Sequence, residues 1–161
     1  VEASDPDFPF FYQLSHETAK IGADNPDNVY WNASISGGNA YRITGRRGSM
    51  FYFSIVANAM RYHIDGSAHP TGSLMSEDIH WGPDGEVEII ASCTPPTGAD
   101  AGKNWLRLEP DASVIIIRQS ALDRSIERGG EFHIERIGGP SVPVPLTEAK
   151  LAQGLGAAAS L

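Results

Sequence analysis

Apolar and polar residues alternate along much of this chain, which is the pattern of half-buried β-strands. Tyr41–Thr44 alternates and leads into Gly45-Arg46-Arg47-Gly48, a sequence typical of a tight turn. Phe51, Phe53 and Ile55 then share one face of a strand, and the residues between them share the other. We therefore expect two strands joined as a hairpin.

A second hairpin is expected between residues 78 and 91. Asp78–Trp81 leads into Gly82-Pro83-Asp84-Gly85, where proline presets φ, aspartate supplies an acceptor and glycine tolerates a positive φ. In the returning strand, Glu86–Ala91, we expect Val87 and Ile89 to point inward and the two glutamates to face water.

Three more strands are expected, over residues 105–108, 113–119 and 131–137. Val114–Ile117 is apolar at every position, which indicates a central strand covered on both faces. Many short strands separated by Gly/Pro turns predict an all-β fold. Our preferred form is an antiparallel β-sandwich of the jelly-roll type with short helical segments at the termini.

The length of 161 residues fits a single β-sandwich domain. We divide it into an N-terminal arm (1–23), a sandwich core (24–137) and a linker with a terminal helix (138–161). In the arm, the aromatic run Phe8–Tyr12 is expected to lie extended across a hydrophobic surface, and residues 14–21 to form a short helix or turn. Val1 at the start and a helix at the end lead us to expect a fragment of a longer chain.

The formal net charge of −8 disfavours nucleic acid and anionic membrane surfaces as partners. No stretch approaches the ~20 apolar residues of a membrane helix, and no signal peptide is visible, which favours a cytoplasmic location. The lone Cys93 ends an apolar run and is expected to be a small buried hydrophobe.

The run Asp24-Asn25-Pro26-Asp27-Asn28-Val29-Tyr30 concentrates carboxylate and amide groups before a strand. One interpretation is a polar rim that faces a ligand. The other, which we favour, is a turn whose Asp and Asn side chains bond the backbone of the same loop.

Arg118 ends the most apolar strand, so its guanidinium should be paired if it is buried. Asp24, Asp27, Asp78 or Asp123 could supply the carboxylate. Asn104-Trp105 resembles a clamp at a strand entry, with the amide on backbone and the indole in the core; a sugar-stacking tryptophan is the alternative. The candidate ligand-binding residues are therefore Asp24, Asn25, Asp27, Asn28, Tyr30, Asn104, Trp105 and Arg118.

A metal site at His63, Asp65 and His69 is not expected, because their spacing matches no familiar ligand set and Asp65-Gly66 is itself a turn signal. The sequence also lacks a nucleophile elbow, a phosphate loop and a dinucleotide fingerprint. No cofactor is indicated, and the catalytic residues, if the chain has any, stay unassigned.

Asn104-Trp105-Leu106, followed after a short turn by the apolar strand ending in Ile117-Arg118-Gln119, resembles the bacterial domain of unknown function 1214 family. Tyr41–Gly45, Asp84-Gly85 and Glu135–Ile137 fit the same pattern, whereas Arg107 stands where that family usually has proline. The resemblance covers roughly residues 24–137. It implies a β jelly roll, often attached to further segments, and carries no established activity.

Three functions remain open. The first is a module that binds a small polar or carbohydrate-like molecule or a partner domain. The second is a hydrolase or lyase that uses Asp24 or Asp27 as a general base beside Arg118. The third is a structural subunit that packs Phe8–Tyr12 and the terminal helix on another chain. Fold alone cannot choose among them.

Overall fold

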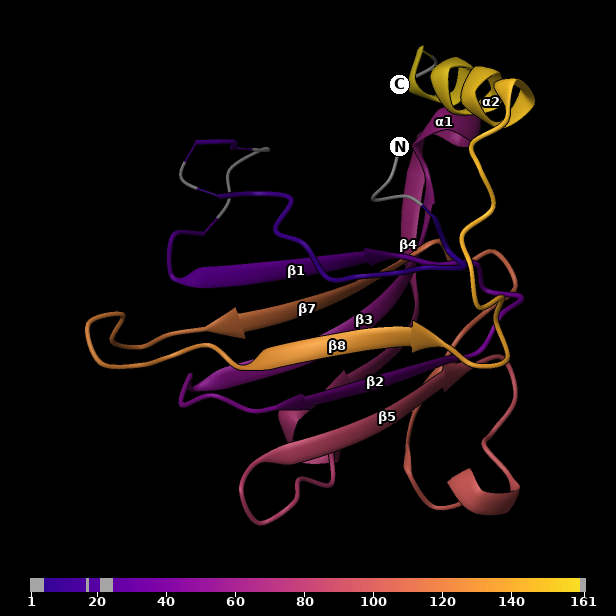
Figure 1. The fold of residues 1–161 in the computed structure, drawn as a ribbon. Helices are drawn as coiled ribbons and strands as arrows, with labels where there is room; N and C mark the ends of the chain where they lie inside the picture. Colours follow the sequence, from indigo (N-terminus) through magenta and orange to yellow (C-terminus); the bar gives the residue numbers. More distant parts are fainter. Residues whose placement is uncertain (1–4, 17, 21–24, 160–161) are drawn as a thin grey trace.

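The protein is a sandwich of two four-stranded sheets, seen in a computed structural model that describes residues 5–16, 18–20 and 25–159 (Figure 1). The first sheet has the order β1-β7-β3-β4 and the second the order β6-β5-β2-β8. The all-β sandwich predicted from the sequence is confirmed. The strands are β1 (Asn28–Ser34), β2 (Tyr41–Arg46), β3 (Tyr52–Arg61), β4 (Ser67–Met75), β5 (Glu86–Ser92), β6 (Asn104–Arg107), β7 (Val114–Ser120) and β8 (Glu131–Arg136).

Helices are few and short. They are α1 (Tyr62–Asp65), α2 (Glu148–Ala159) and two 3-10 turns, Ser76–Asp78 and Gly98–Asp100. Near the N-terminus, the backbone N–H of His16 donates to Ala19 O at 2.8 Å and closes a turn. Within the described part of the chain, no helix is long and apolar enough to cross a membrane.

Both expected hairpins are wrong in their pairing. The strands β2 and β3 follow each other in sequence but lie in different sheets, since β2 pairs with β5 and β8 while β3 pairs with β4 and β7. Asp78–Trp81 is not a strand, although the turn after it forms, with Gly85 at φ 72. The parallel neighbour of β5 is instead β6. Alternation predicts which face a residue occupies, but it does not predict the strand's partner.

The strand β4 was not predicted, because Pro70 and Gly72 interrupt its pattern. It lies at the edge of the first sheet, where proline is tolerated, and its register with β3 shifts between Ala57 and Asn58. A Cβ on Gly72 would lie 2.1 Å from the carbonyl oxygen of Arg107, so glycine lets the two sheets approach at this edge.

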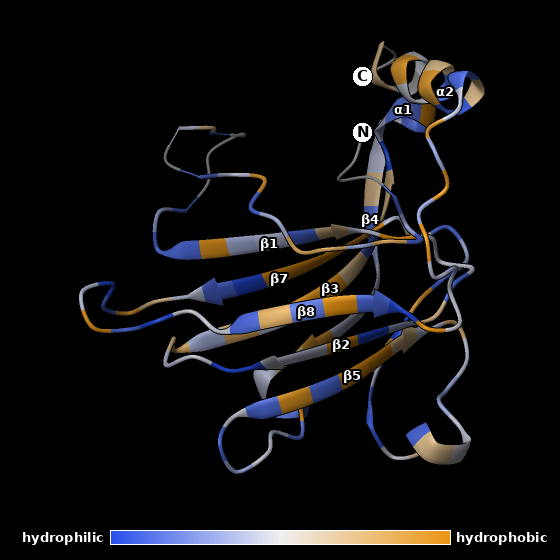
Figure 2. Cartoon of the chain, in the orientation of Figure 1, coloured by the Kyte–Doolittle hydropathy of each residue, from blue (hydrophilic) through white to orange (hydrophobic). Residues whose placement is uncertain are grey.

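The core lies between the sheets and takes its side chains from the inward positions of both. Figure 2 shows β5 alternating between hydrophilic and hydrophobic residues, whereas β7 is hydrophobic until its polar end. The outward residues of β7, Val114 and Ile116, are only half-buried. Each fully buried side chain contributes about 1.5–3 kcal/mol relative to exposure. The largest fully buried apolar side chains are Tyr41, Phe53, Ile43, Ile55, Ile89, Leu106, Leu108, Ile115, Ile117 and Ile134.

The N-terminal arm lies along the free edge of β1. Tyr12 and Asn32 exchange backbone hydrogen bonds of 3.0 and 2.8 Å, and Phe11 packs against the core. Nearer the N-terminus, Pro6 of the arm is held by Tyr41 of β2. The Tyr41 hydroxyl donates to Pro6 O at 3.0 Å and accepts the N–H of Ser36 at 2.8 Å. Burial raises the pKa of Tyr41, so this hydroxyl stays protonated and keeps donating to the arm.

Cys93 differs from its prediction. It is exposed, because β5 ends at Ser92 and the chain then leaves the sheet. Its thiol donates to the carbonyl oxygen of Gly37, with 3.0 Å between the two atoms.

Candidate functional site

Several predicted site residues meet on the outer face of the first sheet. The strands β1 and β7 are antiparallel neighbours, with Asn28 opposite Ser120 and Tyr30 opposite Arg118. Residues directly opposite each other share a face of the sheet. Ile117 points into the core, so Arg118, the next residue, points outward. Its cross-strand neighbour Tyr30 points outward as well.

The aromatic ring of Tyr30 supports the guanidinium of Arg118, whose central carbon lies 5.3 Å from the ring centroid. Such a cation–π contact is worth about 0.5–1 kcal/mol at an exposed site. The Ser120 hydroxyl donates to Asn28 Oδ1 at 2.5 Å, and Asn28 Nδ2 donates to the Tyr30 hydroxyl oxygen at 2.6 Å. The Tyr30 hydroxyl accepts a hydrogen bond from Asn28, so its own O–H proton remains available to donate to another group.

Beside Arg118 the sheet surface forms a hollow of about 130 Å³, lined by Ser54, Val56, Asn58, Ile116 and Arg118. Val56 and Ile116 are half-buried and form an apolar floor. Ser54 is 2% exposed, and its hydroxyl makes no hydrogen bond to any part of the chain that the structure describes. The hollow therefore combines an apolar floor, a cation and a hydroxyl without a partner.

The expected ion pair of Arg118 is not formed within the described residues. Asp78 accepts a hydrogen bond from Met75 N at 3.2 Å, and Asp123 accepts one from Ser125 N at 2.9 Å. Asp24 lies outside the described residues. The exposed guanidinium thus has the ring of Tyr30 beneath it but no carboxylate beside it.

The turn before β1 is bonded within itself, as the favoured interpretation predicted. Asn25 Oδ1 accepts the N–H of Asp27 at 2.9 Å, and the carbonyl oxygen of Asn25 accepts the N–H of Asn28 at 3.1 Å. Ala121 N–H donates to Asp27 O at 2.9 Å and ties the turn to the end of β7. The exposed Asp27 does not line the hollow at Arg118.

Asn104 and Trp105 lie elsewhere, on β6 of the second sheet. The Asn104 amide works as the predicted clamp: its Oδ1 accepts His80 N at 2.8 Å, and its Nδ2 donates to His80 O and to Glu88 O, each at 3.0 Å. The expectation for the indole is wrong. Trp105 stands beside Ile90 on the outer face, half-buried, and its Nε1 donates to Ser92 O at 3.1 Å.

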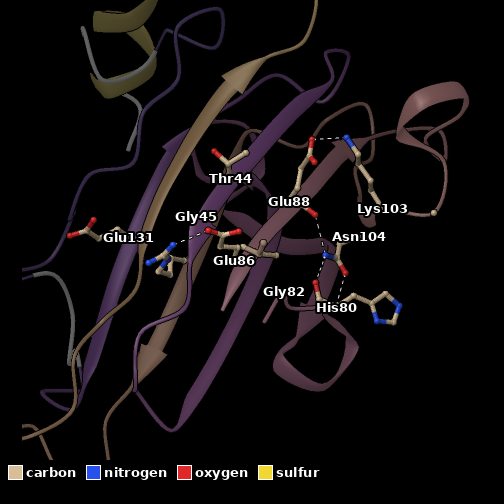
Figure 3. A pocket seen from close by; sticks show the side chains of 12 residues that line it. Thr44, Gly45, His80, Gly82, Glu86, Glu88, Lys103, Asn104 and Glu131 are labelled. Carbon is tan, nitrogen blue, oxygen red and sulfur yellow. Dashed lines mark hydrogen bonds and ion pairs between the residues drawn. The ribbon is translucent and has the colours of Figure 1, made fainter. Parts of the chain in front are cut away.

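A larger, open depression of about 730 Å³ lies on the outer face of the second sheet (Figure 3). Its charged groups pair with one another: Arg46 Nη2 lies 2.8 Å from Glu86 Oε1, and Lys103 Nζ lies 2.7 Å from Glu88 Oε1. The same ammonium lies 2.6 Å from Asp100 Oδ1. This depression is wider than the hollow at Arg118, but most of its polar groups already have partners inside the protein.

The network extends to Arg42, whose Nε lies 3.0 Å from Glu88 Oε1. The hydrogen bond from Lys103 lowers the pKa of Asp100, and the same bond raises the pKa of Lys103. Both shifts favour the charged forms. Opposite charges are thereby held together across a wide range of pH, which is the behaviour of a structural network.

The residues around α1 form another local network. Arg61 Nε and the Ser67 hydroxyl both donate to Asp65, at 3.0 and 2.5 Å, and these bonds lower the pKa of Asp65 to about 2, the Ser67 bond contributing most. His69 Nε2 lies 3.8 Å from Asp111 Oδ2. Over residues 5–16, 18–20 and 25–159, no three His, Cys, Asp or Glu side chains are grouped so that they could hold a metal ion.

Sequence reasoning did not identify the residues of β3 that line the hollow. A usable signal was present: Ser54, Val56 and Asn58 occupy alternate positions of a strand whose other positions are apolar, so they share its outward face. The sequence does not show that β3 pairs with β7. This pairing brings the outward face of β3 next to Arg118.

The comparisons with known proteins give a fold without a function. No family model matches the chain, and no curated protein matches it. The crystal structure of an uncharacterised protein from Burkholderia cenocepacia is 44% identical, with a TM-score of 0.91, and the match covers 99% of this chain and 43% of that one. The chain thus spans less than half the length of this relative.

A weaker match is the crystal structure of the VPA0106 protein from Vibrio parahaemolyticus. It is 9% identical, with a TM-score of 0.46 over 79% of this chain and 34% of that one. The Burkholderia protein, with its TM-score of 0.91, shares the fold described above, and the function is inferred from the site itself.

Proposed function

We propose that this chain is a ligand-binding β-sandwich module that holds a small polar molecule bearing an anionic group against the outer face of its first sheet. The observation that carries the proposal is the exposed guanidinium of Arg118, positioned over Tyr30 and without a carboxylate partner in the described part of the chain. An arginine held in this way is ready to bind a carboxylate or phosphate through two parallel hydrogen bonds.

The groups around Arg118 support an anion rather than a cation. The Arg118 guanidinium and the Ser54 hydroxyl both line the hollow and can donate hydrogen bonds. Val56 and Ile116 offer an apolar floor for the carbon skeleton of the same ligand. A volume of about 130 Å³ suits a small acid or the acidic group of a carbohydrate such as a uronic acid.

Membership of the domain of unknown function 1214 family remains part of this proposal. The pieces that carry the resemblance occupy ordered positions in the fold, since Asn104-Trp105-Leu106 begins β6 and Arg118 lies near the end of β7. The family assignment supplies no activity.

Binding of a partner domain is the second candidate, because more than half of the Burkholderia protein lies outside the matched region. A partner would then place a carboxylate on Arg118 in place of a free ligand. The hydrolase or lyase alternative requires Asp24 or Asp27 to share one cleft with Arg118. Asp27 does not line the hollow, and Asp24 lies outside the described residues.

Isothermal titration calorimetry with benzoate, glucuronate, inorganic phosphate and neutral glucose tests the proposal. We expect at least one anion to bind and glucose not to bind. Arg118→Gln should weaken that binding roughly tenfold or more, which corresponds to the loss of about 1.4 kcal/mol or more. Arg46→Gln is the matched control, since it removes a cation that is paired with Glu86 on the other sheet. Absence of binding by all three anions, or equal loss in both variants, would overturn the proposal.

A further inference from the structure

The hollow beside Arg118 has two polar ends with an apolar middle. Successive cross-strand pairs follow one another along the outward face of β3 and β7, and all of their members except Val114 line the hollow. These pairs are Ser54 with Arg118, Val56 with Ile116, and Asn58 with Val114. A ligand lying along the two strands therefore meets a cation first, then hydrocarbon, then a carboxamide.

The end at Arg118 suits a carboxylate. Arg118 and Ser54 stand opposite each other across the ladder, and the side chains of both can donate hydrogen bonds. Ser54 is 2% exposed, and its hydroxyl has no hydrogen-bond partner in the described part of the chain. A ligand oxygen bound by the guanidinium at this end would also supply the partner that the buried hydroxyl lacks.

The end at Asn58 suits a neutral polar group. Asn58 is half-buried, and its Nδ2 makes one long hydrogen bond, of 3.5 Å, to Val56 O. A carboxamide both donates and accepts, so it can bond a hydroxyl or another amide. Among the residues of the described chain that line the hollow, Arg118 alone is charged. A second carboxylate at the Asn58 end would therefore lose water without gaining a cation.

The floor between the two ends is hydrocarbon. Val56 and Ile116 stand opposite each other there, and both are half-buried. A carbon ring placed on them would take apolar surface of the ligand and of the protein out of water, which is favourable. A ring that carries several hydroxyl groups would instead lose hydrogen bonds to water without finding partners on this floor. The floor thus favours an aromatic or cyclic hydrocarbon over a sugar ring.

The separation of the two ends sets the length of the ligand. Ser54 and Asn58 are four residues apart on β3, so their side chains stand about 13 Å apart. Hydrogen bonds of about 2.9 Å at either end leave about 7 Å for the ligand itself. A six-membered ring with one polar substituent at each end has about this length, and it suits the hollow's volume of about 130 Å³.

We propose that the ligand of this hollow is an aromatic or cyclic monocarboxylic acid with a neutral hydroxyl or amide opposite its carboxylate, and that Asn58 selects this far group. Because Arg118 has to bind the anionic group, the ligand class rests on the proposed function. It is narrower than that function, since it ranks an acid with an apolar ring above inorganic phosphate and uronic acids. It also assigns Asn58 a part in specificity that is separate from the part of Arg118 in affinity.

Calorimetric titration with benzoates that differ only in the group opposite the carboxylate tests this ligand class. We expect para-hydroxybenzoate to bind about three- to tenfold more tightly than para-methylbenzoate, which has nearly the same shape but cannot form the hydrogen bond. Terephthalate, with its second carboxylate, should bind more weakly than para-hydroxybenzoate. Asn58→Leu should remove the preference for the hydroxyl over the methyl group. Asn39→Leu is the matched control, because it removes an amide that donates to the Tyr41 hydroxyl oxygen and does not line the hollow.

Thermal unfolding of each variant checks that the fold is retained, and Asn58→Ala takes the place of Asn58→Leu if leucine is not tolerated. Binding of inorganic phosphate or glucuronate without binding of any benzoate would keep the proposed function and overturn the ligand class. The ligand class is also wrong if para-methylbenzoate binds as tightly as para-hydroxybenzoate, or if the preference persists in Asn58→Leu. Absence of binding by every anion would overturn both.

Discussion

The two outer faces of the sandwich differ in how their charges are used. On the second sheet, Arg42, Arg46 and Lys103 each lie within ion-pair distance of a carboxylate. On the first sheet, Arg118 is exposed over an aromatic ring with no carboxylate beside it in the described chain. The face with the larger depression therefore has its cations neutralised, whereas the smaller hollow keeps a cation available, and the hollow is the better candidate for an anionic ligand.

Cross-strand neighbours explain the difference. Arg46 in β2 stands opposite Glu86 in β5, so opposite charges face each other across that ladder. Arg118 in β7 stands between Tyr30 in β1 and Ser54 in β3, and neither neighbour is acidic. A strand pairing thus either neutralises a cation or leaves it available, and the sequence of one strand alone does not show which.

The largest expected effect comes from removing the clamp beneath the charged face. Asn104→Ala leaves His80 N and O and Glu88 O without their side-chain partner, so we expect a loss of about 1–3 kcal/mol in the free energy of unfolding. Urea unfolding measures it. Asn58→Ala is the control, since Asn58 makes one long bond of 3.5 Å to Val56 O. A change below about 0.5 kcal/mol in Asn104→Ala would show that the clamp is not structural.

A smaller effect separates paired from unpaired arginines. Arg42→Met removes one member of a four-group network, and we expect about 1 kcal/mol of destabilisation. Arg118→Met should change the unfolding free energy by less than about 0.5 kcal/mol while weakening anion binding about tenfold or more. If both variants destabilise the protein equally, the contrast between the two faces is wrong.

The ring of Tyr30 should affect affinity more than stability. Tyr30→Leu removes the aromatic face beneath the Arg118 guanidinium, so we expect anion affinity to fall severalfold, by about 0.5–1 kcal/mol. Calorimetry with the best anion measures this change. The companion variant Tyr52→Leu removes another tyrosine of the same sheet, whose hydroxyl donates to Met75 Sδ, and should leave affinity as it was.

The smallest effect is a pH window specific to the charged face. The pKa of Asp100 is lowered from 3.8, so its contribution to stability is present above pH 3.8 and is lost as the pH falls below that value. The pKa of Lys103 is raised from 10.5, so its contribution is present below pH 10.5 and is lost as the pH rises further. Lys103→Met should therefore destabilise the protein near neutral pH and much less in strong acid. If Lys103→Met and the wild type differ in unfolding free energy by the same amount well below pH 3.8 as at neutral pH, the prediction is wrong.

The features of the fold that the sequence predicted are those that depend on interactions between residues close in sequence. The faces of β3 and β5, the turn at Gly85 and the bonded turn at Asn25 depend on neighbouring residues and were predicted. The pairing of β2 with β8, and the existence of β4, depend on contacts between distant segments and were not. The same limit applies to the site. Tyr30 and Arg118 lie together, as their place in one candidate set predicted. Asn104 and Trp105 lie on the other sheet, because β6 pairs with β5.

The most direct test of the central claim is to map where an anion binds. In a titration of ¹⁵N- and ¹³C-labelled protein with benzoate, followed by NMR, we predict that the largest shift changes fall on the Arg118 guanidinium, the Tyr30 ring and the amides around Ser54. Arg118→Gln should remove them. Changes centred instead on Arg46 and Lys103, or none at any residue, would contradict the account.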